Sequence, residues 1–171
     1  MGLKRSLIKY LAENGFPIQG LSMHVTCKVE KFKEGQTKPY QVLESHHNKF
    51  LVTGMNELWH LAIGSSANHY AEAKSEIGVG TDATAENEAQ TDLIGTPSYK
   101  AMDTGFPTHA VDKQAIFKSI FGISDGNQSW QEFVIKQTDS SVCLVRIVAD
   151  KGTKSSGETW TITITCILAN P

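Results

Sequence analysis

The strongest constraint on the fold is the regular alternation of residue types from Glu158 to Ala169. Threonine occupies positions 159, 161, 163 and 165, and the alternate positions are apolar: Trp160, Ile162, Ile164, Cys166 and Leu168. Because successive side chains of a β-strand point to opposite faces, this pattern predicts a strand with one buried and one exposed face. The strand is longer than usual, so we expect it in the middle of a sheet, with a partner along each edge.

Shorter runs of strand-forming residues precede this strand and are separated by turn residues. The predicted strands span 21–31, 40–43, 99–102, 114–121, 130–136 and 142–148. Turns are predicted at 124–127 and 138–141, and the polar run 150–157 is predicted to be a hairpin loop. Several short strands with turn signals between them predict a mainly β protein, built as an antiparallel β-sandwich or jelly roll.

The stretch from Ile77 to Leu93 combines a short strand with a long connection. Gly78 and Gly80 suit a strand that other groups approach closely, and the residues after Gly80 follow no helical or strand period. The two glycines lack the third glycine of a dinucleotide-binding fingerprint, and no Gly-Lys-Ser/Thr follows them. The stretch therefore does not predict a phosphate site.

Four acidic residues mark the connection, namely Asp82, Glu86, Glu88 and Asp92. No lysine or arginine lies between them, which predicts an acidic loop in solvent. Calcium is an alternative, although the spacing is not that of a dedicated calcium loop.

A helix is predicted from about residue 54 to residue 63, with Thr53 as its N-cap. Its apolar residues recur at helical spacing, as Met55, Leu58, Trp59 and Ala62. We expect this face to pack on one end or edge of a sheet.

A second, shorter helix is predicted near the N-terminus. Its apolar stripe consists of Leu3, Leu7, Ile8 and Leu11, with Lys4, Arg5 and Lys9 on the other side. A helix of two to three turns is marginal alone in water, so the stripe needs a surface to cover it. The chain is therefore divided into an N-terminal helical arm, 1–20, and a β-sandwich domain, 21–171.

Composition and motifs exclude several classes of function. A chain of 171 residues that is 40% hydrophobic and 20% charged is typical of one globular domain, and its net charge of −2 implies no general affinity for nucleic acid. No run approaches the ~20 apolar residues of a membrane span. No catalytic nucleophile motif or metal-ligand spacing is present, and the three cysteines fall within strand-like runs. We expect buried reduced thiols, synthesis in cytoplasm, and no enzymatic activity, cofactor or metal.

Three segments carry a resemblance to a known group of proteins. They are NKFLVTGMNEL at 48–58, IGVGTDATAENEAQTDL at 77–93, and LVRIVADKGTKSSGETWTITITCIL at 144–168. Together with the strands between them, they resemble virion proteins of tailed bacteriophages. Members of that group are β-sandwich modules of tail fibres and collars, or stand-alone proteins that decorate and cement the capsid.

The resemblance implies a non-enzymatic structural protein of the virion that contacts the major capsid protein or other virion subunits. The chain has no long repetitive C-terminal region, which favours a capsid cement or decoration protein over a tail, collar or neck component. The resemblance also implies a closed homo-oligomer, which we expect to be a trimer. A carbohydrate-binding sandwich module is the other alternative, and it requires Trp59, Trp130 and Trp160 as exposed platforms. Their places in apolar periodicities favour the core.

Partner contacts are expected from the predicted N-terminal helix and from the acidic loop. The stripe of Leu3, Leu7, Ile8 and Leu11 either folds back on its own domain or docks on a neighbouring subunit. In the second case, Lys4, Arg5 and Lys9 would face acidic surface of the capsid or of another copy, such as its Asp82, Glu86, Glu88 and Asp92.

Overall fold

The computed structural model describes residues 22–46, 49–109 and 111–169. Of the described residues, 44% lie in strands and 10% in helices, so this part of the chain is mainly β, and its strands form two antiparallel sheets. Sheet A has the order β2-β1-β9-β6 and contains β1 (Ser22–Lys33), β2 (Gln41–Ser45), β6 (Gln114–Phe121) and β9 (Glu158–Ala169). Sheet B has the order β3-β8-β7-β4-β5 and contains β3 (Lys49–Phe50), β4 (Ser75–Gly80), β5 (Ser98–Ala101), β7 (Glu132–Gln137) and β8 (Cys143–Val148).

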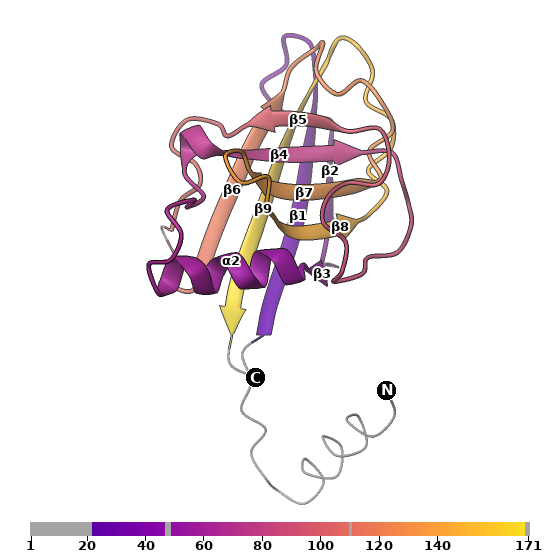
Figure 1. The fold of residues 1–171 in the computed structure, drawn as a ribbon. Helices are drawn as coiled ribbons and strands as arrows, with labels where there is room; N and C mark the ends of the chain where they lie inside the picture. The colour runs from indigo at the N-terminus through magenta and orange to yellow at the C-terminus, as the bar shows by residue number, and fades with distance from the viewer. Residues whose placement is uncertain (1–21, 47–48, 110, 170–171) are drawn as a thin grey trace, which may run out of the picture.

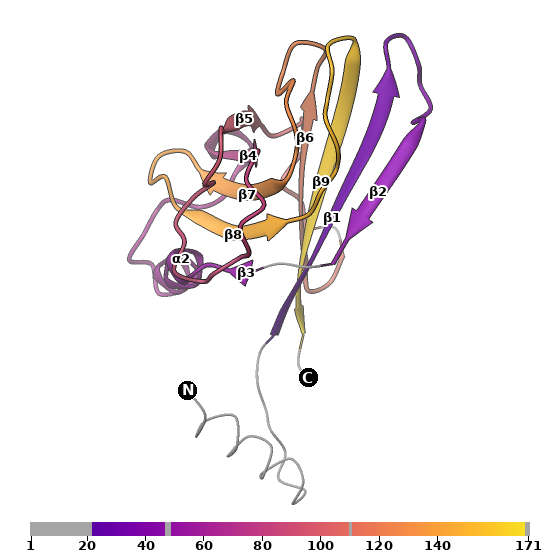
Figure 2. The ribbon, with the colours of Figure 1, turned by 90° about the vertical axis from the view of Figure 1, so that its right-hand side faces the viewer.

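The two sheets are stacked as the layers of a β-sandwich. Figure 1 shows the strands of sheet B running across those of sheet A, and Figure 2 shows the layers from the side. The finer expectation of a jelly roll is not confirmed, because β1–β2, β4–β5 and β7–β8 are simple pairs of successive strands.

The long C-terminal strand lies where its alternation predicts. β9 pairs with β1 along its whole length and with β6 on its other edge. Trp160, Ile162 and Ile164 are buried against sheet B, while Thr163 and Thr165 face outward and are only partly covered. The predicted bounds of β6 and β9 are confirmed, and those of β1, β5, β7 and β8 differ by one or two residues.

Aromatic side chains fill the space between the sheets. The ring centroids of Trp130 and Trp160 lie 4.8 Å apart in an edge-to-face arrangement, and Phe121 and Phe133 contact Trp130 in the same way. The Trp130 indole nitrogen donates a hydrogen bond to the carbonyl oxygen of Gly126, 2.8 Å away, so this buried polar group is satisfied. The core positions predicted for Trp130 and Trp160 are therefore confirmed.

Residues 150–157 were expected to form a hairpin loop, and this expectation is wrong. They connect β8 of sheet B to β9 of sheet A, so they cross between the layers. Lys151 is 2% exposed within this connection, and its amine lies 3.1 to 3.4 Å from Cys27 O, Leu43 O and Ser45 Oγ. Polar turn residues suit a hairpin and a crossover equally, and the strand pairing, together with the buried lysine contacts, distinguishes the two.

The helix α2 (Val52–Ala62) lies beside β8 at one end of the sandwich. It begins two residues earlier than expected, and Thr53 is not its N-cap. Leu51 occupies that position without a side-chain cap, and the Thr53 hydroxyl donates instead to Cys143 O at 3.3 Å. A turn of 3-10 helix, η1 (Glu72–Lys74), follows before β4. The predicted N-terminal helix and the division at residue 20 lie outside the described residues.

Candidate functional site

Helix α2 buries only part of its apolar stripe: Met55 and Leu58 are partly buried, with Leu58 packed against the core, whereas Trp59 and Ala62 are exposed. Its buried residues are Gly54 and Glu57, whereas Trp59 is 71% exposed. Gly54 faces β8 so closely that a Cβ there would lie 2.5 Å from Leu144 O, and no larger residue fits this contact. The Glu57 carboxylate is satisfied by the Ser66 hydroxyl, 2.5 Å away. The prediction of a core position for Trp59 is therefore wrong.

Beside this stripe lie two adjoining cavities that are lined mainly by apolar side chains. The first, about 330 Å³, is lined on the helix side by Met55, Leu58, Trp59 and Ala62. The second, about 400 Å³, reaches inward to Tyr70, Phe117, Leu144 and Cys166. Met23, Leu58 and Leu168 line both, and we call the two cavities together the α2 groove.

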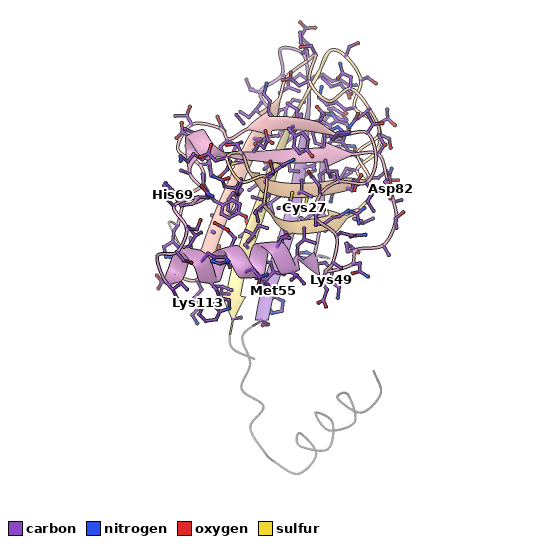
Figure 3. The ribbon with its side chains drawn as sticks, viewed as in Figure 1. Cys27, Lys49, Met55, His69, Asp82 and Lys113 are labelled. Carbon is purple, nitrogen blue, oxygen red and sulfur yellow. The ribbon has the colours of Figure 1, made fainter. Side chains whose placement is uncertain are left out.

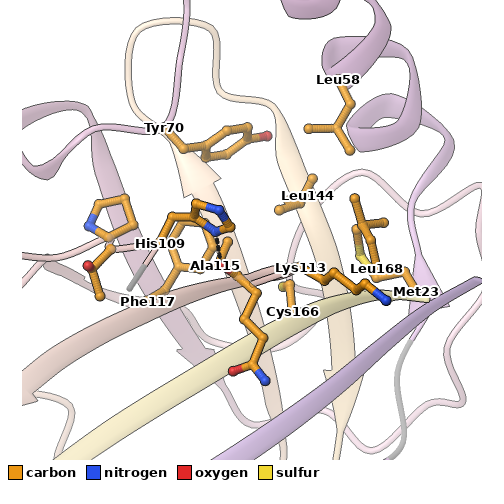
Figure 4. Close-up of a pocket in the computed structure, with 13 residues that line it drawn as sticks. Met23, Leu58, Tyr70, His109, Lys113, Ala115, Phe117, Leu144, Cys166 and Leu168 are labelled. Carbon is orange, nitrogen blue, oxygen red and sulfur yellow. Dashed lines mark hydrogen bonds between the residues drawn. The ribbon is translucent and has the colours of Figure 1, made fainter. Parts of the chain in front are cut away.

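The ends of β1 and β9 form the floor of the groove. Met23 and Leu168 are paired in register, and Leu168 is 37% exposed. In Figure 1 these strand ends extend past α2, where sheet B does not cover them. Figure 4 shows Leu58, Leu168 and Met23 on one side of the inner cavity, opposite Tyr70 and Phe117.

Two polar side chains around the inner cavity, those of Tyr70 and His109, make contacts within the protein. The Tyr70 hydroxyl donates to Val142 O at 3.3 Å, and His109 Nδ1 lies 2.6 Å from Gln114 O. Burial raises the pKa of the Cys166 thiol to about 12, which keeps it protonated at neutral pH. The groove therefore offers mainly apolar contact area, with His109, Lys113 and Gln114 as polar residues of its lining.

The acidic loop is bound to sheet B at three of its four carboxylates. Asp92 accepts hydrogen bonds from Lys136 Nζ at 2.6 Å and from Tyr99 OH at 2.7 Å. Burial opposes ionisation of Asp92, but these hydrogen bonds outweigh it and lower the pKa of this carboxyl. Glu86 accepts from the Val148 backbone N–H at 2.7 Å. The interpretation of a loop in solvent is thus wrong for these residues.

Asp82 is partly exposed, and its carboxylate lies 3.8 Å from the Arg146 guanidinium. Glu88 is exposed. Figure 3 shows Asp82 and Met55 on different parts of the molecule, whereas the middle of the acidic loop reaches the start of α2, where the Val52 N–H donates to Glu88 O at 2.9 Å. The other predicted contact residues, Leu3, Lys4, Arg5, Leu7, Ile8 and Leu11, lie outside the described residues.

Sequence reasoning missed the group that holds the acidic loop in place. Arg146 is fully buried in β8, and its Nη1 donates to Thr84 O at 2.9 Å and Gln90 Oε1 at 3.0 Å. An arginine within the apolar run LVRIV was the available signal, because a buried arginine needs partners. The loop also covers a small second core of Leu51, Val134 and Cys143, so the outer face of sheet B is buried as well.

Within the described ranges, no group of three or more His, Cys, Asp or Glu side chains is placed to hold a metal ion. In the same part of the chain, no helix has the length and hydropathy needed to span a membrane. Fold and surface together define a two-sheet antiparallel β protein with an apolar groove at one end. Comparison with protein-family models, curated proteins and solved structures found no match.

Proposed function

We propose that this chain is a non-enzymatic structural protein of a tailed-bacteriophage virion. In this proposal it is a capsid cement or decoration protein that contacts the major capsid protein and copies of itself. The observation that carries the proposal is the α2 groove, together with the exposed Trp59 and Ala62 of α2 that line it. Exposed apolar surface of this kind on a compact domain is typical of a contact surface for another protein.

The resemblance to phage virion proteins supports the same proposal. Its first segment, 48–58, contributes Met55 and Leu58 to the groove, and its third, 144–168, contributes Leu144 and Cys166. Two of the three quoted segments therefore line the candidate surface. Attachment through an apolar groove needs no catalytic group, in keeping with the absence of a nucleophile motif from the sequence.

A closed homo-oligomer, proposed as a trimer, fits the unpaired edges of the sheets. In sheet A the edge strand β2 is short, and Val42 on it is 49% exposed. Symmetric closure protects such edges from uncontrolled pairing. Light scattering of the purified protein tests this part of the proposal, and a monomer at all concentrations would contradict it.

The location of the protein on the particle distinguishes a capsid cement or decoration protein from a tail, collar or neck component. Heads and tails of the phage that encodes the chain can be purified separately and quantified by mass spectrometry. A fixed stoichiometry with the major capsid protein in heads is expected. Recovery only with tails would favour the tail alternative, and absence from both would contradict a virion role.

The 71% exposure of Trp59 gives the carbohydrate-binding module one specific supporting observation. The other two indoles are buried, so a row of aromatic platforms is not formed. Glycan binding that is lost in Trp59→Ala and retained in Trp59→Tyr would favour this second function. We expect no glycan binding by the unaltered protein.

A further inference from the structure

We propose that the α2 groove is occupied, in the free protein, by the apolar stripe of the chain's own N-terminal segment, residues 3–11. The inference concerns the isolated chain and holds whether or not the virion assignment is correct. Where the virion assignment is correct, the segment and the virion partner share this surface.

The point at which the described chain begins supports this occupant. Ser22, the first residue of β1, itself lines the outer cavity together with Met23. The N-terminal segment is therefore tethered at the rim of the groove. Residues 12–21 can span up to about 35 Å when extended, which is ample for the chain to turn back along α2.

The stripe and the groove also match in chemistry and in length. Leu3, Leu7, Ile8 and Leu11 are all aliphatic, and the outer cavity presents Met55, Leu58, Trp59, Ala62 and Leu168. A helix over residues 3–11 would be about 13 Å long, close to the roughly 16 Å of α2. A helix laid along the groove would thus cover the exposed part of the stripe with its own apolar face.

Tethering favours the segment of the same chain over that of a second copy. A short flexible connection gives the attached segment an effective concentration of about 1 mM at the groove. The N-terminal segment of a second copy, present at micromolar concentration, therefore competes poorly for the groove with the attached segment. Covering Trp59 and Leu168 also removes an exposed apolar patch that would otherwise favour aggregation.

The first test measures access to Trp59 in the full-length protein. Trp130 and Trp160 are buried, so quenching of tryptophan fluorescence by acrylamide reports mainly on Trp59. We expect weak quenching in the unaltered chain and a marked increase in Leu7→Lys, which places a charge on the stripe. Ser6→Lys is the matched control and should leave quenching unchanged, because position 6 lies off the stripe. Strong quenching in the unaltered chain, or equal effects of the two variants, would overturn the proposal.

The second test identifies which copy supplies the segment. Leu3→Cys, Leu7→Cys and Leu11→Cys are each combined with Ala62→Cys and oxidised at low protein concentration. The chain's own thiols, Cys27, Cys143 and Cys166, are buried and should not take part. An intramolecular disulfide in at least one pair, seen as a monomer of altered mobility without reductant, supports the proposal. Covalent dimers or larger species, or no disulfide in any pair, would overturn it.

Discussion

Arg146 of β8 and Glu132 of β7 form an ion pair in which both side chains are fully buried. Arg146 Nε and Nη2 donate to the same carboxylate oxygen, Glu132 Oε2, at 2.9 and 2.8 Å. Glu132 also accepts backbone N–H groups of Ile94 and Gly95, at 3.0 and 2.7 Å. The pair therefore holds the start and the end of the acidic loop against sheet B.

Removing one member of this pair should destabilise the protein severely. Arg146→Met leaves the Glu132 carboxylate buried without its cation, and such losses cost about 3–5 kcal/mol in free energy of unfolding. Urea denaturation measures the effect. Lys74→Ala is the control, because its pair with Asp139 is exposed and should contribute about 0–1 kcal/mol. A similar small effect for both variants would show that the buried pair does not hold the loop.

Stability should fall in acid as Glu158 becomes protonated. Burial opposes ionisation of Glu158, but hydrogen bonds from Lys33, the Ser155 backbone N–H and Tyr40 outweigh it and lower the pKa of this carboxyl to about 2. Because the folded pKa lies below the unfolded value near 4.5, the contribution is complete above pH 4.5 and is lost as the pH falls toward 2.

Urea denaturation of the unaltered protein and of Glu158→Gln across this pH range measures that contribution. The difference between the two free energies of unfolding should be largest above pH 4.5 and shrink in acid. Glu34→Gln, at an exposed position, is the control and should change stability by less than about 0.5 kcal/mol. A difference that does not depend on pH would contradict the prediction.

Gly54→Ala should destabilise the protein although alanine is the better helix former. In an exposed helix the change would gain about 1 kcal/mol. Here the new Cβ would lie 2.5 Å from Leu144 O and 2.7 Å from Leu144 Cα, and backbone cannot move aside locally. Such overpacking costs about 1–3 kcal/mol, so the melting temperature should fall. Gly122→Ala, whose Cβ would meet only Asp125 Oδ2 at 3.4 Å, should be nearly neutral.

The cysteines should be unreactive in the folded protein. Burial raises the pKa of Cys27 and of Cys166 to about 12 and also raises that of Cys143, so little thiolate forms. Ellman's reagent should modify no thiol at neutral pH before unfolding and all three in denaturant. Rapid modification of the native protein would contradict the burial of these residues.

The alternation of apolar and polar residues was sufficient to predict the strands whose two faces differ clearly in hydrophobicity. The alternation from Glu158 to Ala169 predicted both the bounds of β9 and its central place, because a long strand with one apolar face needs partners on both edges. The same reasoning placed β6 correctly and put Trp130 and Trp160 in the core. Gly78 was expected where other groups approach closely, and a Cβ there would lie 2.6 Å from the Tyr99 ring.

Tertiary contacts decided the features that depend on residues distant in the sequence. Arg146 turns a connection that the sequence describes as a solvated acidic loop into a cover for sheet B, through partners 14 to 62 positions away. The period of α2 showed that an apolar stripe exists, but the helix faces inward with Gly54, which fits closely against Leu144, and with Glu57. The spacing of apolar residues along a helix shows which face is apolar. Which face is buried depends on how closely the helix fits the surface it packs against.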